Sequence, residues 1–247
     1  MKKTLISSLV AVMTATAANA SGFYVSPKIA YGTLSADETR VEKQWSGETW
    51  AAFDGNKTEA WDNKDRRITP KFAVGYDFST EKYGFFGIEA EYSHTEYRFD
   101  EANAYVDFEG NTPNDSGDAR HITYADTTIS LNAKYGYNIK DIITPFVRAG
   151  IGLAAIDSEN TFRSGTYWWD TRANEDNFAW NIGAGLELPV AKNVAITLEY
   201  TYTDLGKVEY SNWLNHEKGT SNGTERHFDS KVDLSKHELA AGVKIMF

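Results

Sequence analysis

The sequence lacks cysteine, has too few basic residues to balance its acids, and contains no long apolar run after its first twenty residues. Without cysteine, the chain has no disulfide framework, thiolate zinc site or cysteine nucleophile. Its 25 Lys and Arg face 35 Asp and Glu, a net charge of −10 that repels phosphate and predicts no nucleic-acid partner. A mean hydropathy of −0.49 excludes a bundle of transmembrane helices.

The first twenty residues have the three parts of a secretory signal peptide. Two lysines follow the first methionine, residues 5–13 are apolar, and residues 18–20 read Ala-Asn-Ala, a typical cleavage motif. We therefore expect residues 1–20 to be removed on export and residues 21–247 to form one mature domain in a Gram-negative cell. A soluble periplasmic protein would carry the same signal, so the pattern that follows must decide the compartment.

Eight segments of the mature chain alternate between apolar and polar residues, which is typical of transmembrane β-strands. In the last segment Leu239, Val243 and Ile245 share one face, and Glu238 and Lys244 lie on the other. The eight segments cover approximately residues 23–31, 68–76, 86–93, 127–136, 146–153, 178–188, 194–203 and 238–247.

The two faces of these segments differ in chemistry, and the difference indicates which solvent surrounds the sheet. One face is uniformly aliphatic or aromatic, whereas the other is small, glycine-rich and charged. A sheet with its apolar face in lipid must close, because each unpaired backbone group in hydrocarbon costs several kcal/mol. We therefore predict an all-β fold, a closed eight-stranded antiparallel transmembrane β-barrel with four long extracellular loops and short periplasmic turns.

Five cations and five anions fall on the polar face and are expected to line the lumen. They are Lys28, Lys71, Lys134, Arg148 and Lys244, and Glu89, Glu91, Glu187, Glu199 and Glu238. Equal numbers predict a paired internal network, which is a structural plug and not a catalytic site. Side chains just fill an eight-stranded barrel, so we expect no wide aqueous channel.

The connections between the segments alternate in length. Short turns are expected at residues 79–84, 138–143 and 190–193, and long loops at 34–66, 99–119, 157–176 and 208–232. The long loops carry net charges of −3, −6, −3 and −1, so the acidity of the protein lies on the extracellular tips. This charge either keeps the loops soluble or binds divalent cations that bridge to lipopolysaccharide phosphates. Long connections of this kind usually carry function.

Several tryptophans fall within these loops. Trp45, Trp50 and Trp61 lie in the first loop, and Trp168 and Trp169 in the third. Exposed tryptophans favour contact with a partner. They are equally typical of the aromatic girdle at the lipid headgroups, and for Trp168 and Trp169 both interpretations stay open.

Three stretches resemble small opacity-type and OmpA-like outer-membrane barrels. Residues 183–188 (GAGLEL) with 198–206 (LEYTYTDLG) resemble the penultimate hairpin of these barrels, and residues 144–152 (TPFVRAGIG) resemble their fifth strand. The terminal Phe247, with apolar residues at alternate positions before it, is similar to their assembly signal. The resemblance implies as partners outer-membrane lipid, lipopolysaccharide, the barrel assembly machinery and a host or environmental ligand. We expect no periplasmic domain after the last strand.

Three functions fit these features. The first is a membrane anchor whose loops make surface contacts or reinforce the membrane, and the second is a small porin. The third is a lipid-modifying enzyme, for which Ser93 and His94 are the candidate pair. Adjacent residues of a strand point to opposite faces, so these two cannot share a proton. The histidines match no metal-ligand spacing, and the sequence indicates no catalytic site, metal or cofactor.

Overall fold

The computed structural model consists of β-strands. It describes residues 22–46, 49–52, 63–80, 84–102, 119–139, 142–164, 167–213, 215–216 and 226–247, and the expected signal peptide lies outside these ranges. The strands are β1 (Phe23–Ser46), β2 (Thr49–Ala52), β3 (Asn63–Thr80), β4 (Gly84–Ala102), β5 (Ala119–Gly136), β6 (Thr144–Ser164), β7 (Tyr167–Ala191), β8 (Val194–Trp213), β9 (Asn215–His216) and β10 (Arg226–Met246). Among these residues no helix is long and apolar enough to cross a membrane.

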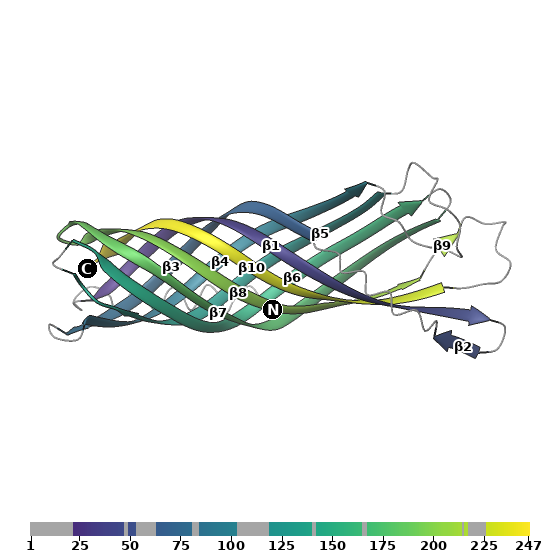
Figure 1. Cartoon of the computed structure of the whole chain (residues 1–247), viewed down its shortest axis with the longest axis horizontal. Helices are drawn as coiled ribbons and strands as arrows, with labels where there is room; N and C mark the ends of the chain where they lie inside the picture. The colour runs from purple at the N-terminus through teal and green to yellow at the C-terminus, as the bar shows by residue number, and fades with distance from the viewer. Residues whose placement is uncertain are drawn as a thin grey trace, which may run out of the picture.

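Eight of the strands form a closed barrel, and β2 and β9 are short additions at its loop end. Around the barrel the order is β1, β3, β4, β5, β6, β7, β8 and β10, and neighbouring strands are antiparallel. Closure comes from β10, which pairs with β1 from Tyr24↔Met246 to Gln44↔Arg226. Figure 1 shows the strands winding around one axis with a strong tilt. The predicted fold is confirmed.

Large apolar side chains cover the outside of the barrel over part of its length. On β6, Val147 and Leu153 are 57% and 67% exposed, whereas Arg148 between them is buried. We call this surface the belt. Its members include Ile29, Tyr31, Ile68, Phe72, Phe86, Ile88, Tyr92, Ile129, Leu131, Tyr135, Val147, Ile151, Leu153, Phe178, Trp180, Ile182, Leu186, Leu188, Ile196, Leu198, Tyr200, Leu239, Val243 and Ile245. A continuous apolar band of this kind is unfavourable in water and favourable in contact with lipid.

Tight turns gather at one end of the barrel, where the C-terminus also lies (Figure 1). Ala191 pairs with Val194 across a turn of two residues, and Ile139 bridges to Ile143. The N–H of Phe247 donates to the carbonyl of Phe23 at 2.9 Å, which joins the last residue to the first strand. Short turns at this end match the periplasmic end of outer-membrane barrels.

At the opposite end the strands run further than the sequence analysis expects. β1 continues to Ser46, and β6 and β7 stay paired up to Ser164↔Tyr167. The expected loop boundaries are therefore wrong, and much of residues 34–66 and 157–176 is strand. We call the strand parts beyond the belt the head. It comprises residues 33–46, 63–67, 94–102, 119–127, 154–164, 167–177 and 179, 204–213 and 226–237.

The head reverses the sidedness of the belt. Along β1 the outward residues change from Ile29 and Tyr31 to the exposed Asp37, while the inward residues change from Lys28 to the buried Leu34. An apolar core thus fills the head, formed by Leu34, Ala36, Tyr97, Phe99, Ile122, Tyr124, Ala154, Ile156, Ala179, Leu205, Val208, Tyr210, Val232 and Leu234. Beyond the lipid both sides of the wall meet polar solvent or protein, so the hydrophobic effect drives apolar residues inward.

Two seams divide the head into two sheets. Pairing of β3 with β4 ends at Lys71↔Ser93, and pairing of β7 with β8 ends at Trp180↔Asp204. Beyond these points β8, β10, β1 and β3 form one sheet and β4, β5, β6 and β7 the other, with the apolar core between them. In Figure 1 the purple end of β1 and the yellow start of β10 lie together, apart from the blue and green ends of β4 and β6.

Each seam begins at a residue that disfavours regular pairing. Pro70 lies next to Lys71 on the head side of the last β3–β4 pair, and proline has no N–H to donate to a ladder. At the other seam, Gly206 has a φ of +81° and sits at a register shift where β8 carries one residue more than β10. A bulge of this kind bends its strand and ends pairing.

Candidate functional site

All ten charged residues that the sequence assigns to the lumen are buried inside the barrel. They come from β1, β3, β4, β5, β6, β7, β8 and β10, and none is more than 6% exposed. The structure places them below the core of the head, at the level of the belt.

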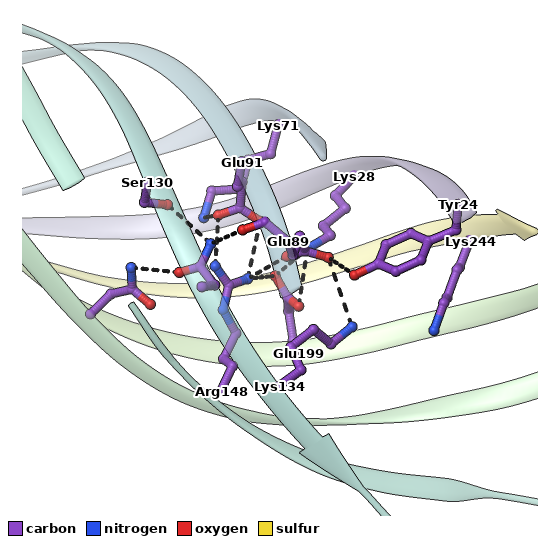
Figure 2. Close-up of polar contacts among 12 residues, drawn as sticks. Tyr24, Lys28, Lys71, Glu89, Glu91, Ser130, Lys134, Arg148, Glu199 and Lys244 are labelled. Carbon is purple, nitrogen blue, oxygen red and sulfur yellow. Dashed lines mark hydrogen bonds and ion pairs between the residues drawn. The ribbon is translucent and has the colours of Figure 1, made fainter. Parts of the chain in front are cut away.

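Two cations and three glutamates form the centre of this cluster. Lys28 Nζ lies 2.8 Å from Glu91, 3.0 Å from Glu199 and 3.2 Å from Glu89. Arg148 Nη1 contacts the same three carboxylates at 3.0, 3.0 and 3.4 Å, and its Nη2 donates to Glu91 at 3.2 Å. Figure 2 shows the carboxylates of Glu89 and Glu91 from β4 and of Glu199 from β8 converging on these two cations.

The network continues toward the periplasmic turns. Lys134 lies 3.0 Å from Glu187, and Lys244 contacts Glu187 at 2.8 Å and also bonds Asp77. Tyr24 donates its hydroxyl to Glu89 at 2.9 Å, and the Lys244 ammonium lies 4.5 Å from the centre of its ring. Aromatic faces thus complete the surroundings of ammonium groups that water does not reach.

Toward the head, the network ends in a second pair. Lys71 lies 2.8 Å from Glu238 and 3.2 Å from Glu91. Lys236 lies 2.6 Å from Asp126 and 3.9 Å from Glu238. Each of these five residues is almost fully buried.

The sequence analysis missed three members of the network, Asp77, Asp126 and Lys236. Each lies outside the limits drawn for its segment and two residues beyond the last inward residue of that segment, as Lys236 does before Glu238. With them, six cations face seven anions in one connected set. The sequence does contain a signal for these three residues. Each is a charged residue at an inward position of the period-two pattern of its strand.

A small polar cavity separates the charged network from the core of the head. It has a volume of about 10 Å³ and is lined by Lys71, Glu91, Ser93, Thr128, Ser130, Asn181, Thr201, Thr203, Lys236 and Glu238. Asn181 Oδ1, Thr201 Oγ1 and Glu238 Oε1 are buried at its walls without a hydrogen-bond partner in the protein. This space and these atoms suit one ordered water molecule, and they are too small for a solute.

Ser93 and His94 are not brought together. Ser93 is buried at the cavity, whereas His94 is exposed on the outside, where its Nδ1 lies 2.8 Å from Thr127 Oγ1. Among the residues with a described position, no group of three His, Asp or Glu side chains is arranged to hold a metal ion.

The loop tryptophans are placed only in part. Trp45 pairs with Trp50 in the β1–β2 hairpin, and Trp168 and Trp169 lie in β7 opposite Arg163 and Phe162 of β6. Trp61 lies outside the described residues. Four of the five therefore lie in strands at the extracellular end of the barrel, Trp50 in β2 and the others in β1 and β7 of the head.

Comparison with known proteins identifies the family of this barrel. Residues 4–247 match the model of the outer membrane protein beta-barrel domain. The chain belongs to this family. As a member of the outer membrane protein beta-barrel family, it resides in the outer membrane, with its belt in the lipid and its head outside the cell.

Relatives and solved structures agree with this assignment. The chain is 31% identical over 137 residues to outer membrane protein PagN of Salmonella typhimurium, which covers 53% of this chain and 55% of PagN. It is 32% identical over 87 residues to the 25 kDa outer-membrane immunogenic protein of Brucella abortus, which covers 33% of this chain and 34% of that protein. The matches thus span about half and a third of these relatives.

The fold also matches the outer membrane protease OmpT from Escherichia coli, with a TM-score of 0.54. Identity to OmpT is 12%, and the match covers 94% of this chain and 100% of OmpT. This likeness shows the barrel fold alone.

Proposed function

We propose that this barrel is a non-enzymatic, non-conducting anchor that presents its head and hairpin tips to partners at the cell surface. The observation that carries the proposal is the reversal of sidedness between belt and head. An apolar core above a connected network of buried charges supports a structural role for the side chains in the lumen. The candidate catalytic pair Ser93 and His94 faces opposite sides of the wall, which supports a non-enzymatic role.

The hairpin tips are the proposed contact surface. Trp45, Trp50, Trp61, Trp168 and Trp169 are the candidate contact residues, because tryptophan supplies much apolar contact area in an interface. A host or environmental surface molecule is the proposed partner, and the acidic tips support a partner that is basic or bridged by divalent cations.

Binding by intact cells tests this proposal. Cells that express the protein are compared with cells carrying the double substitution Trp168→Ala and Trp169→Ala, on epithelial cells and on immobilised matrix proteins and glycans. Trp180→Phe, which changes a tryptophan of the belt, is the matched control. We expect the tip variant to lose binding and the control to keep it. Equal binding by all three proteins would contradict a role for these tips.

The porin alternative predicts a different result. In a planar bilayer we expect no steady current from the refolded protein, because charged side chains fill the lumen at the level of the belt and the polar cavity above them has room for one water. A steady current whose ion selectivity changes with Glu199→Gln would favour the porin instead.

We also propose two steps of biogenesis. Residues 1–20 are removed on export, so the mass of the mature protein should correspond to a chain that begins at Ser21. Phe247 is proposed as the signal for the barrel assembly machinery, so Phe247→Ala should lower the amount of folded barrel in the outer membrane. Its side chain is 61% exposed at the periplasmic end, and Phe247→Tyr is the conservative control.

A further inference from the structure

Basic residues converge where the β3–β4 seam opens. Arg66 and Arg67 lie on β3 and Arg98 on β4, and the carboxylate of Asp65 joins the two strands. Asp65 accepts hydrogen bonds from the backbone N–H of Arg98 at 2.8 Å, from Arg67 Nε at 2.8 Å and from the N–H of Arg66 at 2.7 Å. The Asp65 side chain therefore links β3 to β4 at a level where the two strands are not paired with each other.

The guanidinium groups at this mouth face solvent. The Arg67 side chain is 44% exposed, and Arg66 and Arg98 are exposed as well. The side chains of Arg66 and Arg98 make no ion pair with any residue of the described strands. Among the acids whose side chains the structure describes, Asp65 and Glu96 lie beside them, so these described side chains together carry more positive than negative charge.

Strand pairing is absent between β3 and β4 at the mouth. Beyond Lys71↔Ser93 the facing edges of the two strands are not paired with each other, and the N–H groups of Arg66 and Arg98 donate to Asp65. The guanidinium groups are therefore the donors left for a ligand, and they suit phosphate, which accepts several charge-assisted hydrogen bonds at once.

The mouth lies directly above the belt. Ile68, which is 69% exposed, follows Arg66 by two residues on the same outward face, and it pairs with Tyr31, another belt residue. Arg66 is two residues further along β3, about 7 Å at the usual rise of a strand. This distance places the guanidinium group at the level of the lipid headgroups.

We propose that the mouth of the β3–β4 seam binds a phosphate group of an outer-leaflet glycolipid. Arg66 and Arg98 clamp the phosphate from the two strands, and Asp65 positions Arg67 and the backbone of Arg98. Charge complementarity supports this occupant, because residues 34–64, 99–119, 157–176 and 208–232, which leave out Asp65 and the three arginines, together carry −13 and disfavour an anion elsewhere at the extracellular end. The nearby belt fixes the acyl chains of the same lipid, which a free phosphate lacks.

Lipid titration of the full-length barrel in detergent tests the site. The probes are bisphosphorylated lipid A, the same lipid without its phosphates, and inorganic phosphate, and bound lipid is counted by native mass spectrometry. The double variant Arg66→Gln with Arg98→Gln should weaken binding of bisphosphorylated lipid A at least about tenfold, as expected for lost charged hydrogen bonds. Arg172→Gln is the matched control, an exposed arginine of the head on β7 that pairs with Glu159.

Three results would overturn the proposal. They are equal binding of the lipid without phosphates, an equal loss in the Arg172→Gln control, and equal affinity for inorganic phosphate and for the lipid. The last result would assign the site to free phosphate. Arg66→Lys keeps the charge and removes the planar fork, so it should lose part of the affinity while the fold, checked by circular dichroism, stays intact.

Discussion

Replacing Arg148 by methionine should destabilise the barrel strongly. Its guanidinium group lies within 3.4 Å of Glu89, Glu91 and Glu199, and its side chain is completely buried. Methionine fills a similar length without charge, so the three carboxylates keep their positions and lose one of the two cations at their centre. Lys28 still contacts all three, Lys71 still contacts Glu91, and Glu199 keeps Lys28 as its described cation.

The size of the effect follows from burial. Removing one partner of a buried ion pair costs about 3–5 kcal/mol, because the remaining charge stays desolvated. Arg172 provides the matched comparison, since it pairs with Glu159 at 3.0 Å on a surface where the two side chains are 71% and 46% exposed. Arg172→Met should cost no more than about 1 kcal/mol.

Urea unfolding in lipid vesicles, followed by tryptophan fluorescence, measures both variants. A second variant, Arg148→Met with Glu91→Gln, removes one charge of each sign and should recover part of the lost free energy of unfolding. The reasoning is wrong if Arg148→Met costs no more than Arg172→Met. It is also wrong if the second substitution adds its own cost instead of restoring stability.

Three further substitutions test the belt, the head and a seam. Leu198→Arg changes the central outward residue of β8 between Val194 and Tyr202, and it should cost about 2–4 kcal/mol in vesicle unfolding. Ile156→Asp buries an unpaired carboxylate in the core of the head, so proteolysis should cleave the head while the belt stays protected. Gly206→Val should lower the free energy of unfolding by at least about 1–2 kcal/mol because of the positive φ, whereas Gly206→Asn should cost less.

The strands of the belt were predictable because lipid enforces one pattern. Apolar residues must face outward at every second position, so the ten inward charges are also identified. Residues such as Lys28, Glu91 and Glu199 lie far apart in the sequence, and their mutual contacts depend on register and closure. The alternation pattern predicts that these side chains share the lumen. It does not predict which cation contacts which carboxylate, and those ion pairs are seen only in the structure.

The extent of the head was not predicted, because its pattern of apolar residues differs from that of the belt. In β1 the apolar positions change from Ile29 and Tyr31 to Leu34 and Ala36, a shift of one residue that leaves the strand unbroken. A rule that requires apolar residues on one fixed face ends the strand at this shift. A rule that follows period two through a change of face would also have found Lys236 and Asp126, which lie next to the change.

The change of face and the two seams have a common physical origin. Inside the lipid an open edge is forbidden, and the barrel must close over a charged interior. Above the lipid, water satisfies an unpaired edge, so residues that break pairing are tolerated, as Pro70 and Gly206 are here. Once the wall opens at two places, each sheet is held by apolar packing against the other. The same solvent boundary therefore explains why Leu34 and Ile156 turn inward and why Arg66 and Arg98 meet at an unpaired edge.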